Sequence, residues 1–385
     1  MASFLGHVSL KIGYYLVHNH TGLSYFKLVI TLGIKKQRTA LFLLNVGGLL
    51  MSKTYASSRY CSLLSLVETE EAIRKLKDFF VMNLSQSLNI MKVSAPIMVK
   101  SGNGINDNLN GIERVVSFDA LDSDSSIEIV QSLAKWKRMA VTRYGFQNDE
   151  GLYTDMNAIR RDETLDNTHS LYVDQWDWEK VISEGQRNEQ KLKEEVQKIY
   201  ESIKITEQYM FGLYPKLTPT LPNNIAFITA QELEQLYPQI SPKEREDEIA
   251  RKYGAVFIMG IGGDLPSGEK HDGRSPDYDD WTLNGDIILW NPVLERAFEV
   301  SSMGIRVDRH ALLKQLKESN CEERKSLDYH KAILNEELPS TIGGGIGQSR
   351  LCMFLLKKVH IGEVQASVWS EQIIKECEDN NIPLL

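Results

Sequence analysis

The segment Gly343–Arg350, with the sequence GGGIGQSR, combines residue types that could hold a phosphorylated ligand. Glycines at this density take side chains out of the way, so the backbone can approach a flat or anionic ligand closely. Arg350 stands where an apolar stretch, Leu351–Leu356, indicates the start of a buried helix. Its guanidinium is always charged and offers a fork of donors that suits phosphate oxygens. The alternative is a glycine-rich turn that caps a buried helix, and the rest of the chain has to decide between them.

Two acids that could hold a metal ion, Asp286 and Glu299, flank the apolar segment 287–298. If both lie on adjacent strands, their carboxylates can point into one cleft. Carboxylates that bind Mg²⁺ together with waters and substrate phosphates are the usual arrangement in ATP sites. The alternative is two ordinary surface acids, which are common in any soluble protein.

Three basic residues could complete such a site. Arg160 ends a strand-like segment and could hold an α-phosphate, and Arg306 supplies a second fork, suited to a carboxylate. Lys137 could supply a point charge, although a basic helix face is often simply solvated. Acids interleaved with aromatic residues at 174–178 and 277–281 suit recognition of an amino group, with core packing as the alternative for the two tryptophans of the first stretch.

The composition is that of an ordinary globular protein: 42% of the 385 residues are hydrophobic and 25% are charged. The four cysteines lie far apart, with no CxxC and no Cys/His pairing. This pattern predicts free thiols in a reducing compartment, so we expect a cytoplasmic location, with organellar targeting by residues 1–50 as the alternative. The eight histidines form no HExxH motif, which leaves a hard, oxygen-liganded metal as the candidate.

Charge is distributed unevenly along the chain. Residues 1–67 carry seven Lys and Arg and no acid, so the net charge of −8 for the whole chain becomes −15 for residues 68–385. Nucleic-acid binding relies on Lys and Arg to neutralise phosphates. We therefore expect no nucleic-acid partner.

The N-terminal residues 1–66 differ in composition from the remainder. Residues 1–50 fit an organelle transit segment, or an extension that precedes a true start at Met51. We assign residues 1–66 to an N-terminal extension and expect these residues to be disordered or absent from the mature protein. Their longest apolar stretch, Thr39–Met51, is shorter than the ~20 residues of a transmembrane span, so we expect no stable membrane association. We assign residues 67–385 to one domain.

From residue 67 onward, periodicity and turn signals predict a mixture of helices and strands. The predicted helices are 69–88, 132–141, 179–211, 242–253 and 309–319, and the predicted strands are 91–99, 151–163, 170–179, 225–230, 255–261, 286–290 and 298–300. The strands are scattered among the helices without regular βαβ spacing. This order predicts an α+β fold with a mainly antiparallel central sheet flanked by helices.

These segments, in this order, resemble the catalytic domain of class II aminoacyl-tRNA synthetases. The resemblance is closest to the aspartate and asparagine members and to their free-standing relatives, the ammonia-dependent asparagine synthetases (aspartate–ammonia ligase, type A). It spans about Lys75–Leu385. The stretches specific to the ammonia-dependent enzymes are SLAKWKR (132–138), YVDQWDWE (172–179), PDYDDW (276–281), NGDI (284–287), NPVLE (291–295) and SSMGIRV (301–307). This chain departs from the pattern in its long N-terminus, a short loop after Trp281, and Gln131 where some relatives carry histidine.

The resemblance implies roles for the candidate residues. Arg160 would grip the α-phosphate of ATP, and Arg350 would bind the γ-phosphate or stack on the adenine. Asp286 and Glu299 would hold Mg²⁺, the implied cofactor. Asp107 would lie near the attacking ammonia. The residues that would surround L-aspartate are Ser132, Lys137, Gln175, Asp177, Asp279, Ser302 and Arg306.

The implied activity is the ATP-dependent synthesis of L-asparagine from L-aspartate and ammonia through a β-aspartyl-adenylate, with release of AMP and pyrophosphate. The first family motif, the helix beginning near Thr69 together with the strand that contains Pro96, implies a homodimer. Two alternatives stay open: an aspartyl- or asparaginyl-tRNA synthetase, and a non-catalytic paralogue. Synthetases of that kind carry an anticodon-binding barrel before the catalytic domain, and loss of a phosphate arginine or a Mg²⁺ acid would mark a paralogue.

Overall fold

The computed structural model describes residues 9–18, 24–33, 40–44, 60–106, 109 and 113–385. It divides into two compact units, Met1–Ser52 and Lys53–Leu385. In the first, strands β1 (Ser9–His18), β2 (Ser24–Gly33) and β3 (Ala40–Leu44) form an antiparallel sheet in the order β1-β2-β3. Whether the mature protein keeps this segment stays a prediction. Among the described residues, no helix is both long enough and apolar enough to cross a membrane.

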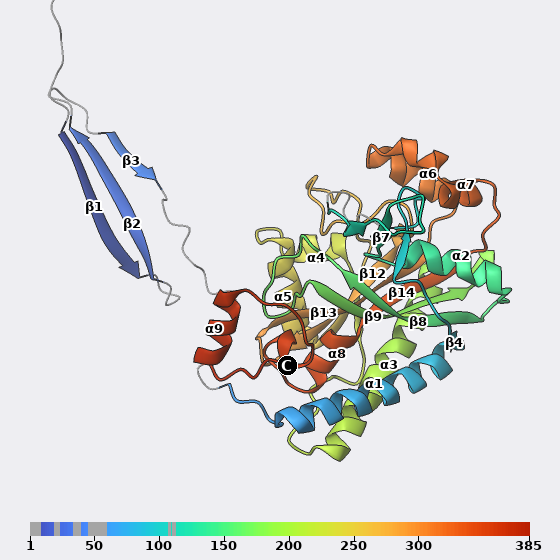
Figure 1. The fold of residues 1–385 in the computed structure, drawn as a ribbon, viewed down its shortest axis with the longest axis horizontal. Coiled ribbons are helices and arrows are strands. Elements are labelled where there is room, and N and C mark those ends of the chain that lie inside the picture. The colour runs from blue at the N-terminus through green and yellow to red at the C-terminus, as the bar shows by residue number, and fades with distance from the viewer. Residues whose placement is uncertain (1–8, 19–23, 34–39, 45–59, 107–108, 110–112) are drawn as a thin grey trace, which may run out of the picture. The chain divides into compact units, whose positions relative to one another are not determined.

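The second unit is built on an eight-stranded sheet with the order β10-β11-β12-β13-β14-β9-β8-β4 (Figure 1). Only the two outermost pairings, β10–β11 and β4–β8, are parallel. The predicted α+β fold with a mainly antiparallel sheet is therefore confirmed. The strands are β4 (Ile90–Lys92), β8 (Gly151–Ile159), β9 (Tyr172–Val181), β10 (Ala226–Thr229), β11 (Ala255–Met259), β12 (Asp279–Asn291), β13 (Arg296–Arg306) and β14 (Thr341–Gly347).

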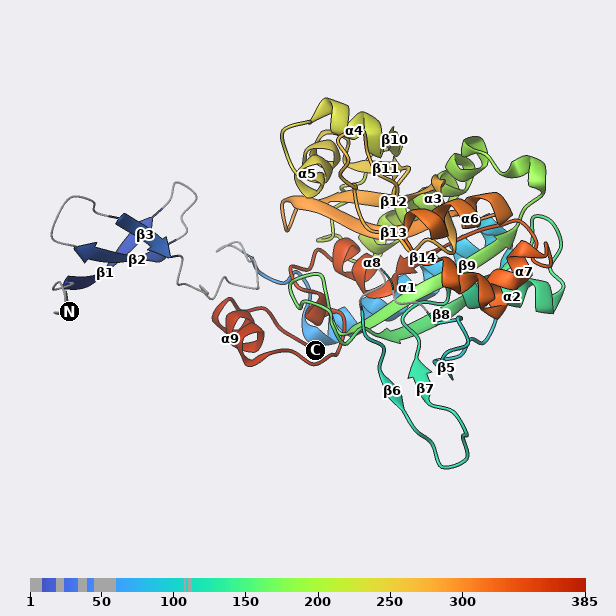
Figure 2. The same ribbon diagram turned by 90° about the horizontal axis from the view of Figure 1, so that it is seen from above.

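One face of this sheet is covered by α1 (Leu66–Leu88), α3 (Glu189–Leu213) and α8 (Gln348–Leu355), which share the main apolar core with it. The other face is covered at one end by α4 (Ala230–Leu236) and α5 (Pro242–Tyr253) and at the other by α2 (Ala134–Tyr144). Helices α6 (Arg309–Glu318), α7 (Asp328–Leu334) and α9 (Glu371–Asp379) and a small sheet of β5 (Met98–Lys100), β7 (Ile127–Ile129) and β6 (Ser117–Phe118) complete the unit. Figure 2 shows the β6–β7 hairpin reaching away from the central sheet.

Local signals explain the helix ends. Helix α5 begins and ends where we predicted, because Ser241 caps it, Pro242 occupies its first turn and Gly254 follows it. Helix α1 begins three residues before the predicted Thr69. Its cap is Ser65, whose side chain and Glu68 form a reciprocal capping box.

Several predicted boundaries differ from those of the structure. The strand predicted at 91–99 is two strands, β4 and β5, in different sheets. The helix predicted from Glu179 begins ten residues later, because Glu179 and Lys180 still belong to β9. The strand predicted from Asp286 begins seven residues earlier, because β12 starts at Asp279. The charged residues Glu179 and Lys180 were mistaken for the polar face of a helix, although both are buried and paired with opposite charges.

The residues just before α1 are packed against the C-terminal part of the chain. The Tyr60 hydroxyl donates to the Glu363 carboxylate at 2.8 Å, and Lys358 Nζ donates to Ser62 Oγ at 2.7 Å. Leu64 is buried in the main core. The described residues 60–66, which we assigned to the extension, thus pack as part of the second unit.

Buried His360 lies in the same region and should make stability depend on pH. Its Nδ1 accepts a hydrogen bond from the Gly362 N–H at 3.0 Å, and its ring packs against Trp369. Burial lowers the pKa of His360 from 6.5 to about 4. The folded protein therefore binds fewer protons here than the unfolded chain, and the stabilisation present above pH 6.5 is lost as the pH falls towards 4.

We expect the free energy of unfolding to fall by about 2 kcal/mol more for the wild type than for His360→Asn between pH 7.5 and pH 5. Asparagine keeps an acceptor for the Gly362 N–H but does not titrate. Urea unfolding of both proteins at the two pH values measures this difference. Parallel pH dependences in the two proteins would show that His360 is not the group responsible.

Candidate active site

The glycine-rich segment is a central strand of the sheet, β14, and not a turn. It pairs with β9 on one side and β13 on the other, with Gly345 opposite both Asp177 and Ser302. A Cβ on Gly343 would lie 2.6 Å from Arg306 Nη2, and one on Gly345 would lie 2.7 Å from Asp177 Oδ1. Glycine is required here because side chains of both neighbouring strands lean over the backbone of β14.

Three alternate residues of β9, Gln175, Asp177 and Glu179, pair with Gly347, Gly345 and Gly343 and so share one face of the sheet. Lys137 reaches this face from α2. Its Nζ donates to the Gly344 carbonyl at 2.8 Å and lies 3.1 Å from Asp177 Oδ2. The other oxygen of Asp177, Oδ1, is buried and has no hydrogen-bond partner among the described residues. Burial lowers the pKa of Lys137 despite the carboxylate of Asp177 beside it.

A second buried charge network adjoins the first. Arg306 on β13 donates from Nη2 to Glu179 Oε2 at 2.7 Å and from Nη1 to Asp279. Thr341 Oγ1 donates to Glu179 Oε1 at 2.6 Å. Burial works to raise the pKa of Glu179, but the Arg306 guanidinium holds it below its usual value; burial does raise the pKa of Asp279. The network holds two acids around one cation.

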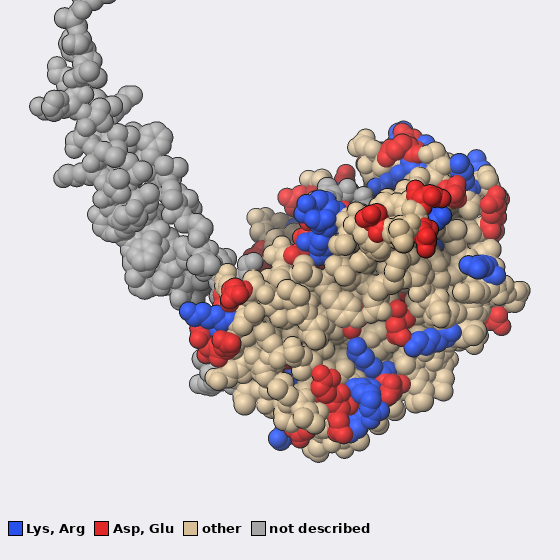
Figure 3. All heavy atoms as spheres, viewed as in Figure 1, with Lys and Arg blue, Asp and Glu red and all other residues tan. Residues whose placement is uncertain are grey.

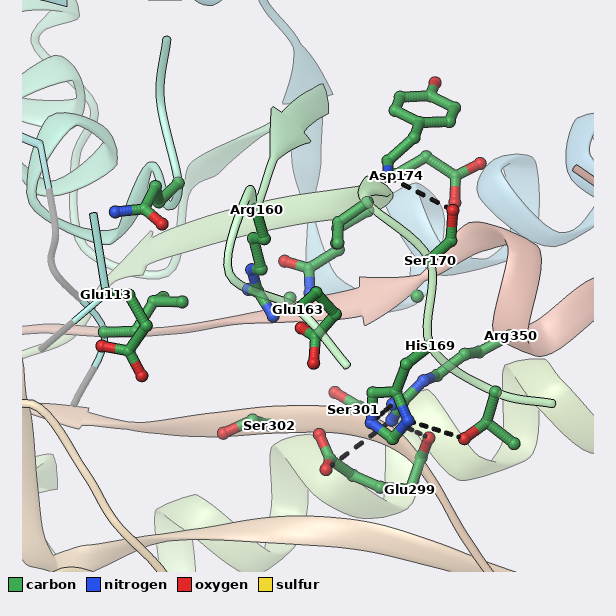
Figure 4. A pocket seen from close by; sticks show the side chains of 18 of the residues that line it. Glu113, Arg160, Glu163, His169, Ser170, Asp174, Glu299, Ser301, Ser302 and Arg350 are labelled. Atoms are coloured by element: carbon green, nitrogen blue, oxygen red, sulfur yellow. Dashed lines mark hydrogen bonds and ion pairs between the residues drawn. The ribbon is translucent and has the colours of Figure 1, made fainter. Parts of the chain in front are cut away.

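A cavity of about 410 Å³ opens on this face of the sheet (Figure 4). Arg160 enters it from the connection that follows β8, and Arg350 enters it from the first turn of α8. The predicted site residues that line the cavity are Arg160, Gln175, Glu299, Ser302 and Arg350. Gly345 and Gly347 also line it. Arg160 Nε is buried and has no hydrogen-bond partner among the described residues.

A β-bulge brings the two candidate metal acids to the same face. On β12 and β13, Asp286 pairs with Ser302 and Ile288 pairs with Glu299. The two partners on β12 are two residues apart and those on β13 are three apart, so β13 contains one extra, unpaired residue, Val300. The extra residue turns Glu299 towards the side of Asp286 and Ser302. Only Glu299 lines the cavity; Asp286 is buried and covered by Arg274, with which it forms an ion pair. Burial and the nearby Glu299 raise the pKa of Asp286 to about 6 although Arg274 opposes the shift.

Arg350 is held at the cavity wall by backbone and side chains. Its Nη1 donates to the Glu299 carbonyl at 3.0 Å, and its Nη2 lies 2.9 Å from His169 Nε2 (Figure 4). Because arginine can only donate, Nε2 of His169 must be the acceptor. Nδ1 of the same ring then carries the proton and faces Asp166 Oδ1 at 2.9 Å.

The other predicted residues lie outside the cavity lining. Lys137, Asp177, Asp279 and Arg306 are buried in the networks that surround Gly343 and Gly345. Ser132 precedes α2 and accepts from the Ala134 N–H at 3.2 Å. Asp107 falls outside the described residues. The predicted residues other than Ser132 and Asp107 thus lie in one cavity or in the charge networks next to it.

Among the cavity residues that sequence reasoning missed are Arg274, His169 and Asp174. Asp174 accepts from the Ser349 N–H at 3.0 Å and from Ser349 Oγ at 2.8 Å, so it fixes the start of the helix that carries Arg350. Its place within the interleaved acids at 174–178 was a signal for it. Arg274 and His169 stand in loops, where no periodicity marks them.

Comparison with known proteins identifies the family. The model of the aspartate–ammonia ligase family matches residues 67–381. The chain belongs to the aspartate–ammonia ligase family. An aspartate–ammonia ligase of Clostridium perfringens (strain SM101 / Type A) is 60% identical over 336 residues, which are 87% of this chain and 100% of that protein. A family member from Fusobacterium nucleatum is 61% identical over 326 residues, 85% of this chain and 99% of its own.

Solved structures of similar shape include tRNA synthetases. Asparaginyl-tRNA synthetase from Pyrococcus horikoshii, complexed with asparaginyl-adenylate, superposes with a TM-score of 0.59 at 14% identity and covers 95% of this chain and 96% of its own. Aspartyl tRNA synthetase from Entamoeba histolytica gives a TM-score of 0.53 at 14% identity, over 88% of this chain and 76% of its own. At such identities the likeness concerns the fold, and it confirms the class II synthetase architecture for this ligase family member.

Proposed function

We propose that this protein makes L-asparagine from L-aspartate and ammonia with consumption of ATP, through a β-aspartyl-adenylate. The proposal rests on one cavity that is lined by two arginines suited to phosphates and by glycines of β14. Buried acidic and basic side chains lie next to these glycines. Membership of the aspartate–ammonia ligase family supports it. The products are asparagine, AMP and pyrophosphate.

The nucleotide end of the cavity contains Arg160 and Arg350. Arg160 would bind the α-phosphate, and Arg350 would bind the γ-phosphate or stack on the adenine. Asp286 and Glu299 fit a Mg²⁺ ion, because Oδ1 of buried Asp286 lacks a partner among the described residues and the two carboxylates share one face. No group of three or more His, Cys, Asp and Glu in the described part of the chain could hold a metal alone, which suits an ion that also takes phosphate oxygens. Bound Mg²⁺ would neutralise charge on the phosphates.

The aspartate end lies over Gly345. Gln175, Asp177 and Asp279 would face the α-amino group, and Lys137 with Arg306 would set the positive potential for the α-carboxylate. Ser132 and Ser302 would complete the contacts. This arrangement would orient aspartate with its side-chain carboxylate towards the arginines. Asp177 Oδ1, which is buried without a hydrogen-bond partner among the described residues, would accept a hydrogen bond from the substrate.

The chemistry follows from that orientation. A carboxylate is a poor electrophile, so its oxygen first attacks the α-phosphorus of ATP, and the bond to pyrophosphate breaks. The arginines stabilise the charge that develops on the phosphate oxygens. Ammonia then attacks the side-chain carbonyl carbon, the bond to AMP breaks, and asparagine forms. Asp107 is proposed to accept a proton from ammonium, which would leave neutral ammonia as the nucleophile.

Product analysis tests the proposed function. The full chain, incubated with aspartate, MgATP and ammonium chloride, should give equal amounts of asparagine and AMP without added tRNA. Formation of ADP in place of AMP, or a requirement for tRNA, would contradict the proposal. Omission of aspartate should abolish AMP release.

Gly345→Ala should weaken aspartate binding strongly. The new Cβ would lie 2.7 Å from Asp177 Oδ1, and that carboxylate is fixed by Lys137. We expect the KM for aspartate to rise at least tenfold, which corresponds to ~1.4 kcal/mol, and the KM for ATP to change less. Gly185→Ala is the matched control, because a Cβ there has no neighbour within 4 Å. Equal KM values for aspartate in both variants would remove Gly345 from the aspartate subsite.

We also propose that the protein is a homodimer that binds no nucleic acid. Exposed Val67 and Met82 on α1 and Met91 on β4 offer an apolar surface for a second copy. For the absence of nucleic-acid binding, the support is the charge distribution: the face in Figure 3 shows Lys and Arg interspersed with Asp and Glu, with no broad basic area. Sedimentation of the wild type and of Met82→Lys measures the dimer; an unchanged monomeric mass in both would contradict it.

A further inference from the structure

Arg274 links the cavity wall to the buried acid Asp286. It belongs to the loop before β12 and lines the cavity, yet only 13% of its side chain is exposed. Its Nη2 forms the ion pair with Asp286 Oδ2, and its Nη1 donates to the Gly273 carbonyl at 2.9 Å and lies 3.8 Å from Asp272 Oδ2. Asp286, Glu299 and Asp272 together hold the pKa of Arg274 well above its usual value.

The acids around this guanidinium need a cation. Asp286 is 3% exposed, and Glu299 lies close enough to raise its pKa. The side chain of Glu299 is 36% exposed and lies 3.7 Å from Arg350 Nη1, so the buried carboxylate is that of Asp286. Neighbouring carboxylates repel each other, and a buried carboxylate is costly without a counter-charge. Oδ2 of Asp286 takes the guanidinium, whereas Oδ1 is buried with no hydrogen-bond partner among the described residues. Among the described residues, only one of the two carboxylate oxygens of Asp286 therefore has a partner.

We propose that Arg274 occupies the cation position of the Asp286–Glu299 pair until nucleotide arrives, and that it then exchanges Asp286 for phosphate oxygens. This inference rests on the proposed function, because it gives the same acids to the divalent cation of the metal–nucleotide complex. A guanidinium suits both partners, since carboxylate and phosphate accept its donors in the same forked geometry. The exchange keeps charge balanced: the acids trade one cation for another, and Arg274 trades a carboxylate for a phosphate.

The consequence is an ordered loading of the site. A divalent ion without nucleotide would have to displace Arg274 into the cavity with no anion to receive it. With nucleotide present, the phosphates supply that anion. The protein should therefore bind free divalent cations weakly and bind them tightly only together with ATP.

Metal binding without chemistry tests this exchange. Mn²⁺ is titrated into the full chain without aspartate and ammonia, and free Mn²⁺ is read from its electron paramagnetic resonance signal. We expect nucleotide-free Arg274→Met to bind one Mn²⁺ at least tenfold more tightly than the wild type, and Arg274→Met/Asp286→Asn to lose that gain. Arg251→Met, which removes an exposed arginine paired with Glu248, is the control and should bind as the wild type does.

The wild type alone provides a second arm that needs no variant. Addition of a non-hydrolysable ATP analogue should lower the concentration of free Mn²⁺ in the presence of the wild type. The decrease should exceed the amount of Mn²⁺ that the same analogue binds without protein. Tight binding of Mn²⁺ by the nucleotide-free wild type, or equal affinities in the wild type and a folded Arg274→Met, would overturn the exchange. Either result leaves the asparagine assay untouched, so failure of this inference is distinguishable from failure of the proposed function.

Discussion

Replacing Arg160 with leucine should lower aspartate-dependent exchange of pyrophosphate into ATP by about a hundred- to a thousandfold. Arg160 reaches the cavity at the end of β8, and its backbone N–H bonds to the Leu171 carbonyl at 2.9 Å, so its position is fixed. Its Nε has no hydrogen-bond partner among the described residues and is ready for an anion. Loss of the guanidinium removes charge stabilisation at the α-phosphate, where the adenylate forms. Exchange of labelled pyrophosphate measures this step without ammonia.

The adjacent Arg161 supplies the control. It is exposed and does not line the cavity, so Arg161→Leu should keep exchange within a few-fold of the wild type. If the two variants lose exchange equally, a general loss of positive charge, and not a contact with phosphate, would explain the effect.

Arg306→Met should destabilise the fold by about 3–5 kcal/mol. The substitution leaves Glu179 and Asp279 buried without their shared cation, and Glu179 is fully buried. Such a loss is a large part of the stability of a typical domain. The midpoint of urea unfolding, followed by circular dichroism, measures the change.

Arg296→Met is the matched control for this second variant. Arg296 lies on the same strand, β13, but is exposed. We expect its midpoint to stay close to that of the wild type. A small change in the unfolding midpoint of Arg306→Met would contradict this prediction. It would mean that Glu179 and Asp279 do not need the guanidinium for stability, and that the role of Arg306 is to bind substrate.

Features fixed by neighbouring residues were predictable from the sequence. The ends of α5 follow from Ser241, Pro242 and Gly254, all within the helix or next to it. The glycine-rich segment was recognisable as exceptional for the same reason. That it forms a strand was not predictable, because the glycines make room for Asp177 and Arg306, which come from other strands.

Features that depend on distant partners were predicted wrongly or missed. Glu179 looked like the start of a charged helix, although it is buried against Arg306, 127 residues away. The bulge at Val300 turns Glu299 to the cavity face. A valine at this position does not indicate a bulge, so the sequence could not predict it. Arg274 stands in a loop among glycines and acids, and only the structure shows that it covers Asp286.

The most direct measurement of the central claim follows oxygen through the reaction. Aspartate labelled with ¹⁸O in its side-chain carboxylate is converted in the presence of MgATP and ammonium, and the phosphorus products are examined by mass spectrometry. A β-aspartyl-adenylate transfers one carboxylate oxygen to the α-phosphorus, so we predict AMP that carries one ¹⁸O and unlabelled pyrophosphate. Label in orthophosphate, or AMP without label, would contradict the account.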